Sequence, residues 1–108
     1  MEMMMRKREN RVIVSVAGRM DTVAAPPFDK RLETLMAEGD TCILIDCKNL
    51  EYMSSAGLQT ILATAKKLEH INGEIILLHL AGAVKEVFEI SGFNNIFRIF
   101  DNEDAAFA

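Results

Sequence analysis

Two short apolar runs, at positions 42–45 and at positions 75–80 with His79 as the one polar residue, constrain the fold of this chain more than any other feature. Runs of this length without regular polar alternation are typical of strands covered on both faces, as in a parallel sheet under helices. Each run follows a segment whose apolar residues recur at helical spacing. These helical stripes are Phe28, Leu32, Leu35 and Met36 in the first segment, and Leu58, Ile61, Leu62, Ala65 and Leu68 in the second.

The remaining sequence continues this alternation of strands and helices. Apolar and β-branched runs predict strands over residues 3–6, 12–17, 42–45, 75–80 and 96–100. Apolar periodicity predicts helices from Pro26 to Gly39, over residues 54–71 and 83–90, and in a short segment capped by Asp101-Asn102. The intervening residues 18–21 and 47–53 are expected to form loops.

Alternating strands and helices predict parallel pairing through right-handed crossovers, after a first antiparallel hairpin. We therefore expect a single α/β domain over residues 1–108. Its sheet would be small and mixed, mostly parallel, with an N-terminal antiparallel strand and helices packed against it. A chain of 108 residues can bury such a core without disulfides or a metal.

Composition and charge exclude several classes of function. The net charge of −4 argues against nucleic acid as a direct partner, because phosphate binding needs a basic surface. No stretch is long and apolar enough for a membrane span, and the N-terminus lacks the apolar region of a signal peptide. We therefore expect a cytoplasmic protein, in which Cys42 and Cys47 are buried thiols. They lie five positions apart in a strand-and-loop region, and an odd separation on a strand places side chains on opposite faces. His70 and His79 are too isolated to indicate a metal site, and no cofactor is expected.

The junction from Asp46 to Leu58 is the most unusual part of the sequence, because it joins a buried strand to a helix that begins at Ser54-Ser55. A helix N-terminus offers free N–H groups and a positive partial charge, which suit a capping hydroxyl or a phosphate. From spacing alone, a plain cap is the better interpretation of these serines. Asp21 and Asp46 could form a carboxylate pair at strand ends, although loop-capping acids are the better interpretation.

Catalytic patterns are absent around these serines. The Gly-x-Ser-x-Gly elbow, the dinucleotide-binding glycine loop and the Walker A loop are all missing from the sequence. His70 would lie roughly 22 Å from Ser55 along the same helix. A small hydrolase or ligand-binding enzyme therefore remains the least favoured class of function.

The segment from Leu50 to Leu58, Leu-Glu-Tyr-Met-Ser-Ser-Ala-Gly-Leu, resembles the signature of STAS domains in anti-sigma factor antagonists. Residues 18–21, Gly-Arg-Met-Asp, resemble the Gly-x-x-Asp motif of that family. The segment from Ala83 to Phe93 resembles its later helix and loop. The three motifs occur in the family's order and cover nearly the whole chain, although Ser54 occupies a position where many members carry Asp.

The resemblance implies a phosphorylatable switch with no enzymatic activity of its own. Unphosphorylated antagonists bind an anti-sigma factor, typically a serine kinase of the histidine-kinase-like ATPase fold, and thereby release a sigma factor. That kinase phosphorylates the motif serine, here Ser55, and a metal-dependent serine phosphatase reverses the step. The residues expected near this site or at the partner surface are Asp21, Asp46, Met53, Ser54, Ala56, Gly57 and Leu58.

A different role within the same family stays open at this point. The chain could be a STAS interaction module of a stressosome-like assembly, a lipid-transport complex or a transporter-associated system. The Ser55 motif favours the switch over these modules. The sequence leaves open the oligomeric state, the binding of a small ligand and the modification of Ser54.

Overall fold

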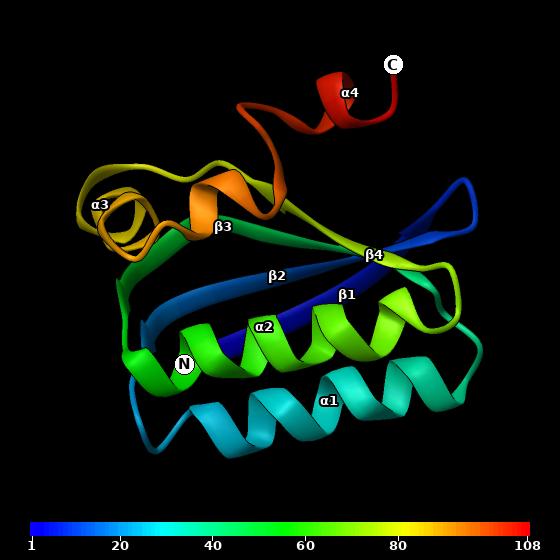
Figure 1. Ribbon diagram of the computed structural model, residues 1–108, viewed down its shortest axis with the longest axis horizontal. Helices are drawn as coiled ribbons and strands as arrows, with labels where there is room; N and C mark the ends of the chain where they lie inside the picture. The colour runs from blue at the N-terminus through cyan, green and yellow to red at the C-terminus, as the bar shows by residue number, and fades with distance from the viewer.

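The computed structural model describes residues 1–108 and contains one five-stranded sheet with the strand order β1-β2-β3-β4-β5 (Figure 1). The strands are β1 (Glu2–Arg8), β2 (Arg11–Met20), β3 (Cys42–Met53), β4 (Glu74–Leu78) and β5 (Arg98–Phe100). The helices are α1 (Ala25–Ala37), α2 (Ser55–Glu69), α3 (Gly82–Ile90), the 3₁₀ turn η1 (Phe93–Asn95) and α4 (Glu103–Ala106). None of these helices combines the length and hydropathy that crossing a lipid bilayer requires.

The first two strands form the expected antiparallel hairpin. Glu9 and Asn10 connect them with φ values of 51° and 65°, which is the backbone of a two-residue turn that matches the strand twist. Strand β1 is longer than the sequence indicated, because Lys7 and Arg8 also pair with β2. The hairpin therefore places a basic strand at one edge of the sheet.

The other three pairings are parallel, as the alternation of strands and helices predicted. Because the strand order follows the chain order, right-handed crossovers place α1, α2 and α3 on the same face of the sheet. The main core lies under these helices, where Phe28, Leu32, Ile61 and Phe88 are fully buried against the inner side of the strands. The starts of α1 and α2 consequently lie at the same end of the sheet (Figure 1).

The opposite face of the sheet carries only α4, which packs on a smaller cluster that includes Ile13 and Leu44. Asn102 caps α4 through a 2.8 Å hydrogen bond from the Ala105 N–H to its side-chain oxygen, as the sequence predicted. Glu103 accepts hydrogen bonds from the guanidinium groups of Arg6 and Arg8 on β1. These bonds hold the pKa of the Glu103 carboxyl below its ordinary value of 4.5, and the bond from Arg6 has the largest effect.

Two segments predicted as loops are strands, and this corrects the sequence interpretation. Gly18–Met20 continues β2, and residues 47–53 continue β3 as far as Met53. The two extensions pair with each other, but the register shifts between Ser15 and Ala17 and again between Gly18 and Arg19. Such bulges break the two-residue alternation from which strands are predicted. The later strands are shorter than predicted, since β4 ends at Leu78 and β5 begins at Arg98.

Candidate functional site

Ser54 caps the start of α2 and attaches the helix to the sheet. Its backbone is extended, and its hydroxyl oxygen accepts a hydrogen bond from the Gly57 N–H at 3.2 Å. Its own N–H donates to the Met20 carbonyl at the end of β2, at 2.8 Å. The capping interpretation of the serine pair therefore holds for Ser54, whose side chain is committed to the fold.

Ser55 is the first residue of α2 and is exposed to solvent. Its hydroxyl forms none of the chain's side-chain hydrogen bonds, in contrast to that of Ser54. Because Ser55 lies at a helix N-terminus, nearby N–H groups and the helix dipole favour negative charge at this position. The side chain is thus accessible to a modifying enzyme, and a phosphate here is compatible with the helix.

Gly57 allows α2 to approach the sheet closely. A methyl group at this position would lie 2.5 Å from Met20 Cγ and 2.6 Å from Met53 Sδ, well inside van der Waals contact. Met20 and Met53 are paired across β2 and β3, and both are buried. Met53, Gly57 and Leu58 therefore position the helix from within the core and present no side chain to a partner.

Asp21 follows β2 directly. It lies beside the start of α2, because the carbonyl of the preceding residue, Met20, accepts the hydrogen bond from the Ser54 N–H. Its carboxylate accepts a 2.9 Å hydrogen bond from the Ala24 N–H, and its carbonyl accepts one from Ala25. Asp21 thus fixes the turn into α1, which agrees with the loop-capping interpretation. A shallow groove runs between the first turns of the two helices, lined by Thr22, Ala25, Pro26, Asp29, Ala56, Gln59 and Thr60.

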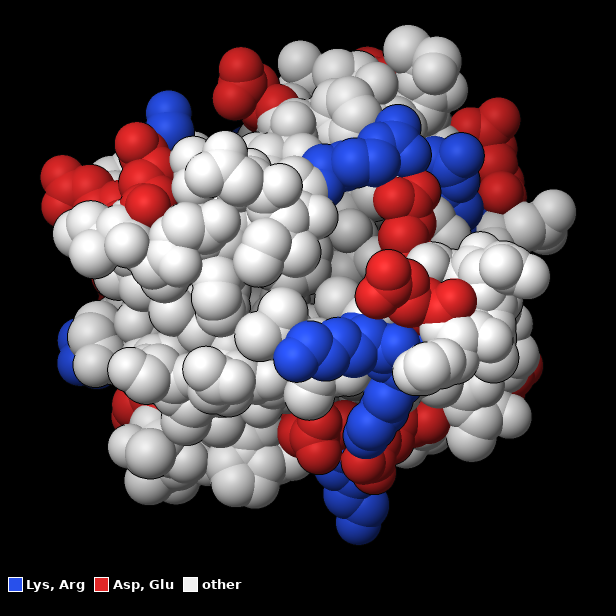
Figure 2. All heavy atoms as spheres, viewed as in Figure 1, with Lys and Arg blue, Asp and Glu red and all other residues white.

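The surface around Ser55 is nearly free of charge. In α1 the first charged residue is Asp29, and in α2 no charged residue occurs before Lys66. Figure 2 shows the consequence, since the side where both helices begin is mostly uncharged and charged side chains gather over their later turns. Such a surface has little desolvation cost when a protein partner covers it.

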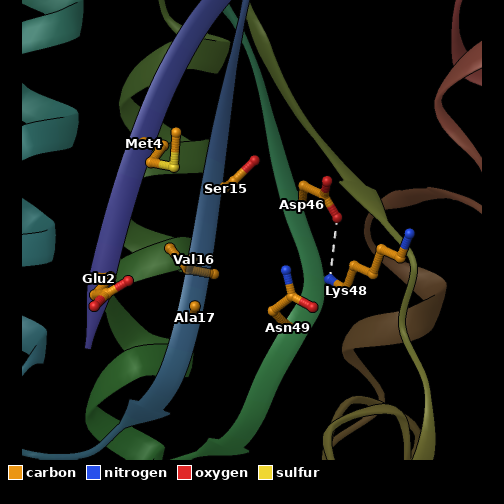
Figure 3. Close-up of a pocket in the computed structure, with 8 residues that line it drawn as sticks. All are labelled: Glu2, Met4, Ser15, Val16, Ala17, Asp46, Lys48 and Asn49. Atoms are coloured by element: carbon orange, nitrogen blue, oxygen red, sulfur yellow. Dashed lines mark hydrogen bonds between the residues drawn. The ribbon is translucent and has the colours of Figure 1, made fainter.

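Asp46 does not belong to this site, contrary to the sequence interpretation. The register places it opposite Ser15, six residues before Asp21 along β2, which corresponds to roughly 20 Å. Its carboxylate instead accepts the Lys48 N–H at 3.0 Å (Figure 3) and contacts His79 Nδ1 at 2.8 Å, on the face of the sheet that carries α4. The idea of an Asp21–Asp46 carboxylate pair is therefore wrong, because it treated residues 47–53 as a short loop.

The cysteines lie on opposite faces of β3 as predicted, but they differ in burial. Cys47 is buried in the main core, and loss of hydration raises the pKa of its thiol to about 12. Cys42 is only half-buried beside the smaller cluster, so the prediction of two buried thiols holds for one. The pKa of Cys42 is also raised, chiefly by burial.

Two features of this end of the molecule were missed from the sequence. Val23, in the turn before α1, is 83% exposed, which is unusual for a β-branched apolar side chain. Arg19 lies over the ring of Tyr52, with the guanidinium carbon 4.3 Å from the ring centre. The register pairs these two residues across β2 and β3. The sequence did not indicate this contact, because both residues were predicted to lie in loops.

Comparisons with known proteins agree with this architecture. BtrV of Bordetella bronchiseptica, which is named as an anti-sigma factor antagonist, is 35% identical over 108 residues that span all of this chain and 93% of BtrV. An anti-sigma factor antagonist from Mycobacterium paratuberculosis superimposes with a TM-score of 0.89 at 23% identity, over 98% of this chain and 90% of that one. Bacillus SpoIIAA in its phosphorylated form gives a TM-score of 0.76 at 23% identity, over 97% and 96%.

The family model of the STAS domain matches residues 2–106 of the chain. Nearly every residue described above therefore lies within the match, including the sheet, the four α-helices and the two serines. The solved structures share this fold at low identity, and BtrV is similar in sequence over nearly its whole length. The chain is thus a member of the STAS domain family, of the anti-sigma factor antagonist type.

Proposed function

We propose that this protein binds a serine-kinase-type anti-sigma factor in its unphosphorylated form, and that phosphorylation of Ser55 ends the binding. The observation that carries the proposal is the division of roles between adjacent serines. Ser54 uses its hydroxyl to cap the Gly57 N–H, whereas Ser55 is exposed with its hydroxyl free. A kinase that approaches the start of α2 would meet Ser55 as the available nucleophile.

The partner surface we propose consists of the first turns of α1 and α2 and the turn between β2 and α1. Val23 offers an exposed apolar contact, and Ala56 lines the groove between the helices. Apolar and small side chains of this kind can form the centre of a protein interface without buried unpaired charges. The proposed surface lies around Ser55, so a modification there would affect the whole contact.

A phosphate on Ser55 would change this surface through charge. The phosphate adds roughly 1.5 to 2 negative charges to a region that is almost uncharged. Asp21, beside the start of α2, and Asp29, in the groove between the helices, already carry negative charge there, so the phosphate would make the surface distinctly acidic. A buried, unpaired or like-charged group at an interface costs several kcal/mol, and each 1.4 kcal/mol weakens binding about tenfold. The fold itself would persist, because a helix N-terminus tolerates a phosphate.

The names of the relatives support this assignment. BtrV is named as an anti-sigma factor antagonist, and Bacillus SpoIIAA has been solved in both unphosphorylated and phosphorylated forms. By this proposal the partner is an anti-sigma factor kinase of the histidine-kinase-like ATPase fold. A serine phosphatase would restore the binding form, and the chain itself acts as a substrate and catalyses neither step.

The test is a phosphorylation assay with candidate anti-sigma kinases from the same genome. Each kinase is mixed with the protein, ATP and magnesium, the phosphosite is mapped by mass spectrometry, and binding is measured before and after. We expect phosphate on Ser55 and loss of kinase binding once it is attached. Ser55→Ala should bind without accepting phosphate, whereas Ser54→Ala, the matched control, should still accept it.

Two results would contradict the proposal. Phosphate that survives Ser55→Ala would remove Ser55 from its role. Absence of both binding and phosphate with every candidate kinase would favour an interaction module of a system without a sigma factor.

A further inference from the structure

Strand β1 presents an unusually open edge of the sheet. It is seven residues long, contains no proline, and pairs with β2 without any register shift. Natural proteins commonly block such edges with short strands, bulges, proline or free charged side chains. The other edge of this sheet, formed by β5, offers little to an additional strand, because β5 has only three residues.

The basic side chains of β1 do not shield its outer edge, because each forms an ion pair with an acidic residue of the same chain. Lys7 Nζ lies 2.8 Å from the carboxylate of Asp40, which is only 6% exposed. Arg6 and Arg8 both bind Glu103 on α4, as described above. Each basic side chain is thus drawn back over its own domain, and the backbone edge is left uncovered.

The two-residue turn determines which backbone groups face outward. In such a hairpin the residues that flank the turn, Arg8 and Arg11, form a hydrogen-bonded pair, and bonded and non-bonded pairs then alternate along the strands. The N–H and C=O groups of Met3, Met5 and Lys7 therefore point away from β2. An additional antiparallel strand would bond to these three residues.

The sequence of β1 is complementary to itself in one register. If two copies pair antiparallel about Met5, Glu2 of each lies opposite Arg8 of the other, and Met4 lies opposite Arg6. Opposite charges across a strand pair stabilise it, and Arg8, which binds Glu103 and Asp104 through one nitrogen only, keeps further N–H donors for Glu2. The Arg6 stem can cover Met4, which is 74% exposed. Pairing about Lys7 would instead oppose Arg6 and Arg8, and parallel pairing would align identical charges.

We propose that two copies of this protein associate through β1, antiparallel and centred on Met5, to form one continuous ten-stranded sheet. About six backbone hydrogen bonds would join the copies, two at Met5 and four between Met3 and Lys7. Ser55 begins α2, which packs against β3 and β4 and not against the β1 edge, so Ser55 stays accessible in both copies. This pairing is independent of the proposed switch.

A cysteine cross-link tests the register. In the proposed dimer the two copies of residue 5 face each other with Cα atoms about 5.5 Å apart, within the range that a disulfide spans. Met5→Cys should therefore give a covalent dimer under mild oxidation, and mass spectrometry should find the disulfide-linked peptide that joins the two substituted positions. Met3→Cys is the matched control, because the two copies of residue 3 would lie roughly 13 Å apart and should not cross-link.

Two further measurements test the unmodified protein and the charge complementarity. Sedimentation velocity between about 10 and 500 µM should show a dimer fraction that rises with concentration, as expected for a small interface. Glu2→Lys should weaken association about tenfold, whereas Glu9→Lys, the same change in the turn outside the pairing, should leave it unchanged. A protein that stays monomeric throughout this range overturns the proposal. Equal cross-linking of both cysteine variants, or equal effects of both lysine variants, overturns the register.

Discussion

Replacement of Gly57 by alanine tests how the start of α2 is held against the sheet. The new methyl group would lie 2.5 Å from Met20 Cγ and 2.6 Å from Met53 Sδ, in a site where both methionines are buried. Overpacking of a buried site costs about 1 to 3 kcal/mol. Alanine gains roughly 1 kcal/mol over glycine in helix propensity, so the net loss of unfolding free energy should lie between about 0 and 2 kcal/mol.

A double-mutant cycle with Met20→Ala separates the steric clash from other effects. Met20→Ala removes the atom closest to the new methyl group and leaves space that Met53 and the methyl can fill. In that background Gly57→Ala should become neutral or stabilising, which corresponds to a coupling energy of about 2 kcal/mol. Denaturant unfolding followed by circular dichroism measures all four proteins.

Two outcomes would refute this reasoning. If Gly57→Ala stabilises the natural protein, the close contact of α2 with Met20 and Met53 is not the reason for glycine. If the substitution costs the same in both backgrounds, the loss arises elsewhere, for example in the backbone of the first helical turn. Either result would also weaken the view that this contact fixes the position of Ser55.

Three further predictions concern caps, thiols and pH. Ser54→Ala should lower the free energy of unfolding by about 1 kcal/mol because it removes the helix cap, whereas Ser55→Ala should change it by less than about 0.5 kcal/mol, as measured by urea titration. The thiol of Cys47, with its pKa raised to about 12 by burial, should resist a thiol reagent at pH 8 in the native protein and react after unfolding. The hydrogen bond from Arg6 lowers the pKa of Glu103, so the stability that Glu103 confers is complete above about pH 4.5 and is lost as the pH falls through the lowered value. Hydrogen exchange of α4 amides should show this loss, and Glu103→Gln should abolish the pH step.

Much of the fold was predictable because local patterns determine it. The helices carry apolar stripes of helical period, and Pro26, Gly39 and Gly73 mark their limits. The buried strands are continuous apolar runs, which sequence shows clearly. The cap at Ser54 was also predictable, since serine before an apolar helical stripe is a common start signal.

The extension of β3 could not be predicted in this way. Its buried residues Cys47, Leu50 and Met53 are three positions apart, a spacing that arises because β3 carries one extra residue at each register shift with β2. A strand with this spacing does not show the two-residue alternation used to recognise strands. The same error brought Asp46 too close to Ser55 in the predicted site.

The remaining differences depend on contacts between residues far apart in the chain. Asp46 meets His79 across 33 positions, and Arg6 meets Glu103 across 97. No local pattern reports such pairs, because they arise only when the sheet and its last helix are assembled. The open backbone edge of β1 is likewise visible only once the partners of its basic side chains are known.

The strand order has a consequence for how the chain acquires its structure. Every sheet pairing joins strands that are neighbours in sequence, so each strand can add to the one made before it during synthesis. Only the contact of α4 with the β1–β2 hairpin connects the two ends of the chain. We therefore expect this contact to form last, as a closing step that follows assembly of the sheet and requires the longest loop to be ordered.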